Sequence, residues 1–273
     1  MMRSLWTSAT GMNAQMLQID VISNNLSNVN TTGYKRERIE FATLVYATLL
    51  RANLDPATMT GRSVNLQVGH GARTAAVTRN FNQGMLQRTD LDFDFAISGR
   101  GFFEIARGDD LLMYTRDGSF KVMPSGDGNL ILTTFDGFHV MDTNGDSILI
   151  PVDIDLDTLT ITEDGTFVFL NDDGIPEDLG HQLRIVQFPN AQGLEAIGSN
   201  LFIETVASGE RLFEIDGDVA RESVVLQGFL EMSNVAVAEE MISLITAQRA
   251  FDVASRGITT SDEMLQTAMQ LRR

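Results

Sequence analysis

Residues 4–28, SLWTSATGMNAQMLQIDVISNNLSN, carry a seam of apolar and small residues at the spacing of a coiled-coil helix. At about 1.5 Å per residue, a helix over this stretch is roughly 37 Å long. The seam recurs at steps of three or four and consists of Leu5, Ala9, Met12, Met16, Ile19, Ser23 and Leu26. Because an isolated helix of this length is marginal in water, the seam is expected to need a partner.

A second seam lies near the other end of the chain. Its positions are separated by steps of three, four or seven and are Val237, Met241, Leu244, Phe251, Ile258, Leu265 and Met269. Two long helices are therefore predicted at the two ends, flanking a middle of different composition. We predict that the seams pack against other copies of the chain. An ordinary intramolecular helix pair is the alternative, and the two arrangements are compatible.

The first helix is predicted to end in the run SNNLSNVNTTGYK at residues 23–35. Asn, Ser, Thr and Gly favour helix caps, turns and left-handed backbone over continued helix. Asn24, Asn25 and Asn28 are therefore interpreted as amides that hydrogen-bond the backbone, and Gly33 as part of the turn by which the helix leaves for the rest of the chain.

The net charge of −17 is concentrated in the middle of the chain. Residues 1–89 have a net charge of +5, residues 90–180 of −16 and residues 181–273 of −6. An acidic chain with a pI near 4.4 repels phosphates, so no nucleic-acid partner is predicted. The short basic run of Lys35, Arg36 and Arg38 contains Glu37 and is predicted to be a solvated or interface face.

No apolar run approaches the ~18 residues of a membrane helix, so no membrane insertion is predicted. The start of the chain, MMRSLWTSATGMNAQ, lacks the apolar core of a cleavable signal peptide. The chain is therefore expected either to stay in the cytoplasm or to leave it by another route. The absence of cysteine excludes disulfides, thiolate metal sites and cysteine nucleophiles.

The middle of the chain indicates antiparallel β-structure. Residues 34–50 are compatible with helix or strand, and residues 51–70 indicate a projecting loop or β-ribbon. From about residue 72 to 225, short alternating runs are separated by Asp-Gly pairs beginning at residues 117, 127, 136, 164, 173 and 216, with Asn144-Gly145 as a similar pair. These pairs predict type I′ hairpin turns, in which both central residues have a positive φ.

Motifs for catalysis are missing from the sequence. His70, His139 and His181 lack metal-ligand spacing, and no nucleophile elbow, Walker loop or dinucleotide fingerprint occurs. The segment DTNGD at residues 142–146 has glycine at the wrong position for an EF-hand loop. The sequence therefore predicts no catalytic, cofactor-binding or metal-binding residues, and no enzyme.

Four segments together resemble the bacterial flagellar rod and hook proteins. They are SATGMNAQMLQIDVISNNLSNVNTTGYKR at 8–36, GRGFFEI at 99–105, YTRDGSFKV at 114–122 and QGFLEMSNVAVAEEMISLITAQRAFDVASRGITTSDEMLQ at 227–266. The resemblance covers nearly the whole chain, in order. Within the family, the opening MRSLWTSATGM at 2–12 and the total length are most similar to the distal rod subunit, with a proximal rod subunit as the alternative. Residues 46–66 lie where the distal rod subunit has a segment that the hook subunit lacks.

The resemblance implies an α+β fold with long terminal helices flanking an antiparallel all-β outer domain and an extended connecting segment. Its domains would be residues 1–32 with 233–273 as the inner tube, 33–71 as the connecting domain with a rod-type loop, and 72–232 as the outer domain. Asn24, Asn25, Asn28 and Gly33 match the turn motif of the family.

The implied function is that of a structural subunit of the rod in the periplasmic space. It would be exported through the flagellar type III apparatus without a cleaved signal and would polymerise into a hollow helical shaft. Its partners would be further copies, proximal rod proteins, hook or hook-junction subunits and, where present, the L/P-ring bushing. A secreted β-rich binding module or adhesin is the alternative from another class. The predicted interface residues are Leu5, Met12, Met16, Ile19, Leu26, Val237, Met241, Leu244, Phe251, Ile258, Leu265 and Met269.

Overall fold

The computed structural model describes residues 2–54, 61–62, 64–108, 111–126, 128–154, 156–171, 175–214 and 223–271. The chain forms two compact units, which are described separately. Unit 1 comprises residues 1–27, 37–78 and 236–273, and unit 2 comprises residues 28–36 and 79–235. The predicted α+β class, with long terminal helices and antiparallel sheets, is confirmed.

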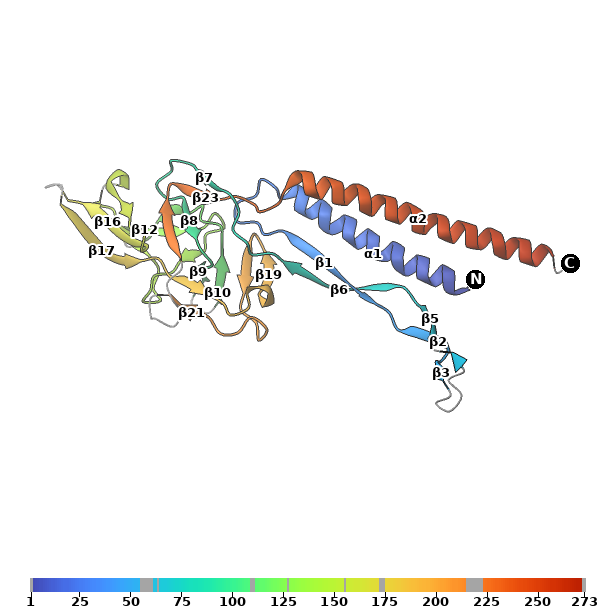
Figure 1. Ribbon diagram of the computed structural model, residues 1–273. Helices are drawn as coiled ribbons and strands as arrows, with labels where there is room; N and C mark the ends of the chain where they lie inside the picture. Colours follow the sequence, from blue (N-terminus) through green and yellow to red (C-terminus); the bar gives the residue numbers. More distant parts are fainter. Residues whose placement is uncertain are drawn as a thin grey trace. The chain divides into compact units, whose positions relative to one another are not determined.

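The two terminal helices of unit 1 are α1 (Met2–Ser27) and α2 (Val237–Gln270), and they pack side by side (Figure 1). They run in opposite directions. Ser4 is hydrogen-bonded to Ser261 near one end of the pair, and Asn25 to Glu240 near the other. The structure therefore contains the intramolecular helix pair that the sequence left open as an alternative.

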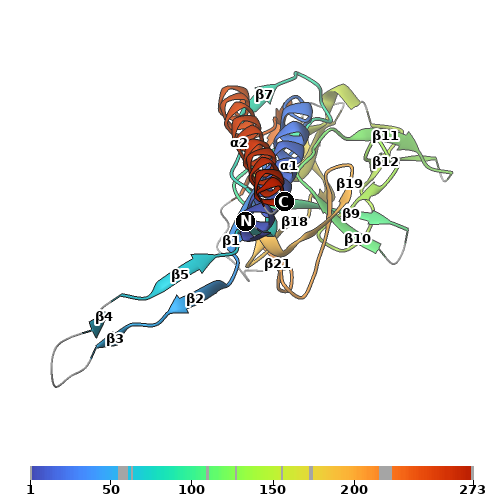
Figure 2. The same cartoon turned by 90° about the vertical axis from the view of Figure 1, so that its right-hand side faces the viewer.

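The rest of unit 1 consists of paired strands, so residues 34–50 contain strands and no helix. Strand β1 (Glu37–Thr43) pairs with β6 (Ala72–Arg79). Beyond them, β2 (Tyr46–Leu50) pairs antiparallel with β5 (Leu66–Gly69), and β3 (Asn53–Leu54) with β4 (Gly61–Arg62). These outer pairs form a ribbon that projects away from the helix pair (Figures 1 and 2).

A ten-stranded antiparallel sheet forms the centre of unit 2. Strand β9 lies in its middle, between β13 and β10, and β18 pairs with β9 as well. The strands are β9 (Phe102–Arg107), β10 (Leu111–Thr115), β11 (Lys121–Pro124), β12 (Asn129–Thr133), β13 (His139–Val140), β14 (Leu149–Pro151), β18 (Ile185–Gln187), β19 (Glu195–Gly198), β20 (Leu201–Ile203) and β21 (Leu212–Phe213).

Smaller sheets surround this centre. The strands β15 (Thr160–Ile161), β16 (Thr166–Leu170) and β17 (Pro176–Gln182) form a three-stranded sheet. Two-stranded pairs are formed by β8 (Phe95–Ser98) with β22 (Val224–Gln227) and by β7 (Leu86–Arg88) with β23 (Phe229–Glu231). Two short 3₁₀ helices, η1 (Leu156–Thr158) and η2 (Ala191–Gly193), complete the unit.

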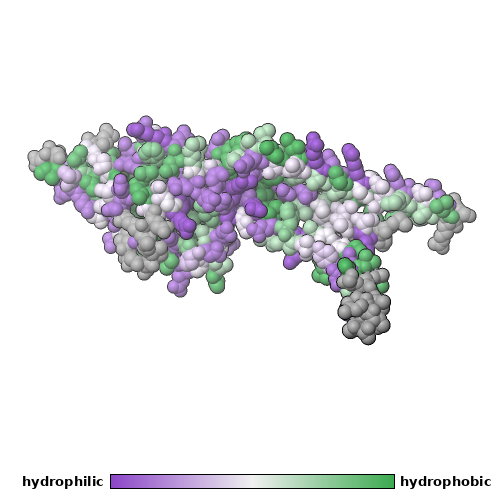
Figure 3. Space-filling view, viewed as in Figure 1, coloured by the Kyte–Doolittle hydropathy of each residue, from purple (hydrophilic) through white to green (hydrophobic). Residues whose placement is uncertain are grey.

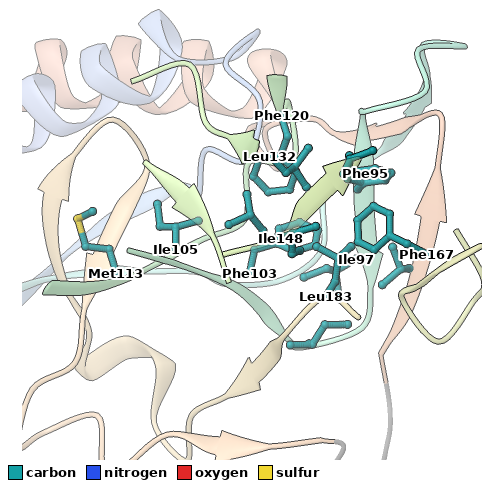
Figure 4. Packing of buried hydrophobic residues seen from close by; sticks show 14 of the residues in the cluster. Phe95, Ile97, Phe103, Ile105, Met113, Phe120, Leu132, Ile148, Phe167 and Leu183 are labelled. Atoms are coloured by element: carbon teal, nitrogen blue, oxygen red, sulfur yellow. The ribbon is translucent and has the colours of Figure 1, made fainter. Parts of the chain in front are cut away.

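The core of unit 2 is rich in phenylalanine and isoleucine (Figure 4). Because successive side chains of a strand point to opposite faces, β9 contributes to two clusters. Phe103 and Ile105 belong to the larger cluster, while Phe102 belongs to a second cluster with Phe202. Strand β9 is thus buried on both faces, and its one buried charged residue, Glu104, is paired with Arg184 Nη1 at 2.9 Å.

The predicted type I′ turns are wrong for the described Asp-Gly pairs. Gly137, Gly145 and Gly165 have φ values of 82°, 87° and 82°, but the preceding Asp136, Asn144 and Asp164 do not have a positive φ. In the pair Asp117-Gly118, neither residue has one. In the pair Asp136-Gly137, Gly137 N–H donates to Thr134 C=O at 2.9 Å, and Thr134 N–H donates to Phe138 C=O at 2.8 Å. This is a three-residue hairpin with a glycine bulge, which needs a left-handed backbone only at the glycine. Asp127 and the pairs at 173 and 216 fall outside the described residues.

Candidate assembly interface

Small residues allow the two helices of unit 1 to approach each other closely. On α1, Ala14 is buried, and on α2 Ala247 and Ser261 are buried. A Cβ added at Gly257 would lie 2.9 Å from Ser8 Oγ. The Oγ atoms of Ser4 and Ser261 are 3.3 Å apart. Alanine, serine and glycine therefore lie at the closest approach of the two helices, and the larger Ile22 of α1 is buried as well; the predicted seam named none of these residues.

The larger predicted interface residues divide into two groups. Eight are half-buried within the single chain: Leu5, Met12, Ile19, Leu26, Leu244, Phe251, Ile258 and Leu265. Four are exposed by 41–68%: Met16, Val237, Met241 and Met269. A single chain therefore covers part of the predicted seam and leaves another part in solvent.

Other large apolar side chains of the helices, and Leu271 directly after α2, are exposed as well, although the heptad pattern did not include them. We call all eleven exposed residues the outer apolar set: Trp6, Met16, Leu17, Val237, Met241, Ile242, Ile245, Val253, Met264, Met269 and Leu271. Apolar and weakly polar atoms are visible along the helix pair in Figure 3. A helix that is apolar on more than one side is typically buried on more than one side. The total apolar content, and not its period, was the signal for these residues.

Charge is scarce on α1. Its 26 residues include a single cation, Arg3, and a single anion, Asp20. Burial of charged groups is expensive, whereas serine, threonine and asparagine can be buried when they are hydrogen-bonded. The surface of α1 is therefore suited to being covered by protein.

The predicted turn residue Asn25 joins three segments of unit 1. Its side chain is buried, donates to Glu37 C=O at 2.8 Å and accepts from Glu37 N–H at 2.9 Å. It also donates to Glu240 Oε2 at 3.3 Å. The amide of Asn25 thus bonds both backbone groups of Glu37, as a residue of a neighbouring strand would. It thereby ties the start of β1 to α1 and, through Glu240, to α2. Asn24 makes a longer, exposed contact of 3.4 Å with Glu37.

The other two predicted turn residues, Asn28 and Gly33, lie in unit 2. Asn28 C=O accepts from Thr31 N–H at 3.2 Å. Gly33 has a φ of 68°, and its N–H donates to Glu231 C=O at 2.8 Å. A Cβ at this position would lie 2.6 Å from Asp117 N. Glycine is therefore required here both by the backbone conformation and by the close approach of the chain.

The prediction of a solvated or interface face is wrong for Lys35, which is buried in unit 2. Its Nζ lies 2.5 Å from Glu231 Oε1 and 3.0 Å from Asn82 C=O. Arg116 Nη1 lies 3.2 Å from the other oxygen, Glu231 Oε2. We call Lys35, Arg116 and Glu231 the polar clamp. Burial lowers the pKa of Lys35, and the charge of Glu231 opposes this shift.

Sequence reasoning missed the polar clamp because its members are far apart in the chain. The pair Lys35 and Glu231 is separated by 196 positions, so no spacing rule applies to it. The one signal in the sequence for the polar clamp was composition. Lys35 and Glu231 are charged residues inside turn-forming or apolar segments that resemble family motifs.

In the part of the chain that the structure describes, no group of three or more His, Asp or Glu residues is placed to hold a metal ion. None of the described helices is both long and apolar enough to span a membrane.

Comparison with known proteins decides the family. A model for the "Flagella basal body rod protein" matches residues 5–35, one for the "Flagellar hook protein FlgE/F/G D1 domain" matches 96–169, and one for the "Flagellar basal body rod FlgEFG protein C-terminal" matches 226–271. The flagellar basal-body rod protein FlgG of Borreliella burgdorferi is 46% identical over 100% of both chains. The chain belongs to the FlgG family of flagellar basal-body rod proteins. FlgG of Caulobacter vibrioides is 39% identical over 99% of this chain and all of the relative, and FlgG of Bacillus subtilis is 37% identical over 100% of both.

Membership of the FlgG family confirms the predicted resemblance and the predicted distal rod protein. It places the chain in a structural, non-enzymatic family, in agreement with the prediction that it is not an enzyme. A FlgG-family chain is located in the basal-body rod and assembles with other rod or hook components. The helix pair and the polar clamp are therefore to be understood as parts of an assembling subunit.

Proposed function

We propose that this FlgG-family chain polymerises helically through its terminal helices into the hollow shaft of the distal rod, which transmits torque to the hook. The outer apolar set carries this proposal. Ten large apolar side chains of the helices, together with Leu271 directly after α2, are exposed in a single chain. Exposed apolar surface of this extent on two helices is typical of a surface that another protein covers.

The energetics favour burial of the outer apolar set in a polymer. A large apolar side chain contributes about 1.5–3 kcal/mol when it is fully buried. Association costs about 4–15 kcal/mol in lost freedom of motion. The free energy gained by burying most of the outer apolar set therefore exceeds the cost of association. Each subunit in a helical array also has several neighbours over which this burial can be shared.

The predicted interface residues have two proposed roles. The four residues that are exposed in the single chain contact neighbouring subunits directly: Met16, Val237, Met241 and Met269. The eight half-buried residues, from Leu5 to Leu265, support the helix pair and are covered further when neighbours are added. Asn24, Asn25, Asn28 and Gly33 fix the direction in which the chain leaves α1.

For the assembled rod we propose three layers. Residues 1–32 with 233–273 form the inner tube, residues 33–71 connect, and residues 72–232 form the outer domain. The family resemblance supports this division. In the assembly, proximal rod proteins and hook or hook-junction subunits are the axial neighbours, and the L/P-ring bushing surrounds the shaft where it is present. The subunit reaches the periplasmic space by type III export without a cleaved signal peptide.

Two methionines of equal exposure give a matched test. Met241 on α2 and Met123 on β11 are each 51% exposed. The purified wild-type chain is concentrated and examined by electron microscopy, in which we expect straight tubes. Met241→Asp is expected to prevent tubes, because it places a charge in the proposed contact, and Met123→Asp is expected to leave them intact. A wild-type chain that stays monomeric at every concentration, or tubes formed equally by Met241→Asp, would contradict the proposal. A monomer that binds a ligand would favour the binding module or adhesin.

A further inference from the structure

Three passages of unit 2 lead the chain to and from unit 1. Residues 28–36 run from α1 to β1, residues 79–84 begin at the end of β6, and residues 231–235 lead from β23 to α2. Every crossing of the chain between the two units lies at an end of one of these passages. Any force that the backbone carries from one unit to the other therefore runs through them.

The side chain of Asn234, which lies in the third passage, binds the other two. Its Oδ1 accepts from Arg36 N–H at 2.8 Å. Its Nδ2 donates to Asn80 C=O at 2.8 Å and to Asn82 C=O at 2.9 Å. We call Asn234 and these three partners the passage clasp. All of its members belong to unit 2, so the clasp is a feature of that unit alone.

Further hydrogen bonds join the same passages. Asn80 N–H donates to Arg36 C=O at 2.9 Å, so the first two passages are also paired directly through their backbones. Asn82 C=O accepts from Lys35 Nζ as well as from Asn234, which makes the passage clasp continuous with the polar clamp. Every pair of passages is thus joined by more than one hydrogen bond.

Only an amide side chain suits the centre of the passage clasp. The N–H of Arg36 requires an acceptor, whereas the two carbonyls require donors. Asparagine presents one acceptor oxygen and an NH₂ group with two donors. Aspartate has the same shape but no donor when it is ionised, so it would place an oxygen against the two carbonyl oxygens. The chemistry of Asn234, and not its size, therefore holds the clasp.

We propose that Asn234 makes the three passages a single joint, which keeps them together when force acts between the two units. In a hydrogen-bonded network, one passage separates only when several bonds break together, so the network resists opening more than a single contact does. The proposal rests on the proposed shaft that transmits torque, because a subunit in such a shaft experiences this force. Without the clasp, the passages separate more easily and one unit turns more freely against the other.

The first test measures this freedom of motion in the unassembled full chain. The chain contains no cysteine, so Asp136→Cys in unit 2 and Asp252→Cys in unit 1 place two spin labels at exposed sites. Pulsed electron spin resonance then gives the distribution of distances between the labels. We expect a narrow distribution with Asn234 in place, and one that is about twofold broader or more with Asn234→Asp.

Asn190→Asp is the matched control, because it makes the same change at another exposed amide of unit 2. Asn190 Nδ2 donates to Ala207 C=O at 3.0 Å, and Ala207 belongs to none of the three passages. We expect this control to keep the wild-type width. Asn234→Ala removes the same hydrogen bonds without adding a charge and should broaden the distribution as well. Broadening by Asn234→Asp alone would show an effect of charge and overturn the role of the amide.

The second test asks whether the passages separate from each other. Asn80 N–H bonds to Arg36 C=O and not to the side chain of Asn234. In Asn234→Ala we expect this N–H to exchange its hydrogen roughly tenfold faster or more, while the amides of β9 keep their wild-type rates. An unchanged rate at Asn80 would show that Asn234 holds only its own contacts and would contradict the joint.

Three further results would overturn the joint. One is a broad distance distribution in the chain that retains Asn234. Another is an unchanged width in both Asn234 variants. The third is faster exchange throughout β9 in both variants, which would show that Asn234 holds the fold of unit 2 itself. None of these results bears on polymerisation, which is tested separately by the tubes of the wild-type chain and by the Met241→Asp comparison.

Discussion

Lys35 Nζ lies 2.5 Å from Glu231 Oε1, and both side chains are 1% exposed. The same oxygen accepts from Gly84 N–H at 2.8 Å. One carboxylate therefore joins three separate passages of the chain in unit 2: the segment that follows α1, the loop that follows β6, and β23, which precedes α2. Arg116, which directly follows β10, joins a fourth passage to this contact through Glu231 Oε2.

Glu231→Gln is expected to destabilise unit 2 by about 3–5 kcal/mol, because it leaves two buried cations without their carboxylate. Urea unfolding of the unassembled chain measures the loss. Arg88→Ala is the control, since Arg88 and Asp90 form an ion pair whose side chains are 72% and 70% exposed. This change is expected to cost about 1 kcal/mol or less. Equal losses in the two variants would contradict a special role of the polar clamp.

Gly33→Ala is expected to destabilise the chain by more than about 2 kcal/mol, because an L-residue is strained at this φ and the new Cβ would lie 2.6 Å from Asp117 N. Gly11→Ala provides the matched control. Gly11 lies inside α1, and a Cβ there meets no atom within 4 Å. Alanine is the better helix former, so this variant is expected to gain up to about 1 kcal/mol. Thermal unfolding decides, and a fully stable Gly33→Ala protein would refute the assigned turn.

The sequence predicted the features of this fold that depend on local periodicity. The heptad spacing from Leu5 to Leu26 identified α1, and the cluster of Asn and Gly after it identified the turn. Alternation predicted an antiparallel middle, because the pleat of a strand has a period of two. These signals need only neighbours in the chain.

Features that depend on distant partners could not be predicted in this way. The burial of Lys35 follows from Glu231, which lies 196 positions away. The packing of α1 on α2, in which Glu240, Ala247 and Ser261 are the buried residues of α2, decides which seam residues are covered within one chain and which are exposed. For Asp-Gly pairs, the sequence identified turns, but the choice between type I′ and a glycine bulge depends on the register of the flanking strands.

Leu244 and Met241 separate folding of the helix pair from assembly. Leu244 is half-buried, whereas Met241 is 51% exposed. We expect Leu244→Asp to lower the helical signal and the thermal stability of the unassembled chain, because a carboxylate would be partly buried at this position. Met241→Asp is expected to leave both unchanged and to impair only tube formation. Far-UV circular dichroism below the assembly concentration measures the difference. Equal helicity of the two variants would mean that the helix pair does not depend on Leu244.

Acid should weaken unit 2 through Asp142, whose carboxylate is 1% exposed. It lies 3.0 Å from His181 Nδ1 and accepts from Gln182 N–H at 2.9 Å. Burial raises the pKa of Asp142, but the hydrogen bonds of His181, Gln182 and Thr143 outweigh burial, and its pKa falls below the ordinary 3.8.

A carboxyl group whose pKa is lower in the folded state stabilises the fold above its unfolded pKa, and this contribution is lost as the pH falls through the folded pKa. Asp142→Asn is therefore expected to be less stable than the wild type near neutral pH, by about 1.5–3 kcal/mol, and to lose less on acidification to about pH 3. Urea unfolding at the two pH values measures both effects. Asp146→Asn, an exposed change of the same charge in the same turn, should keep the wild-type acid response. If Asp142→Asn follows the wild type in parallel at both pH values, this carboxylate does not set the acid sensitivity of unit 2.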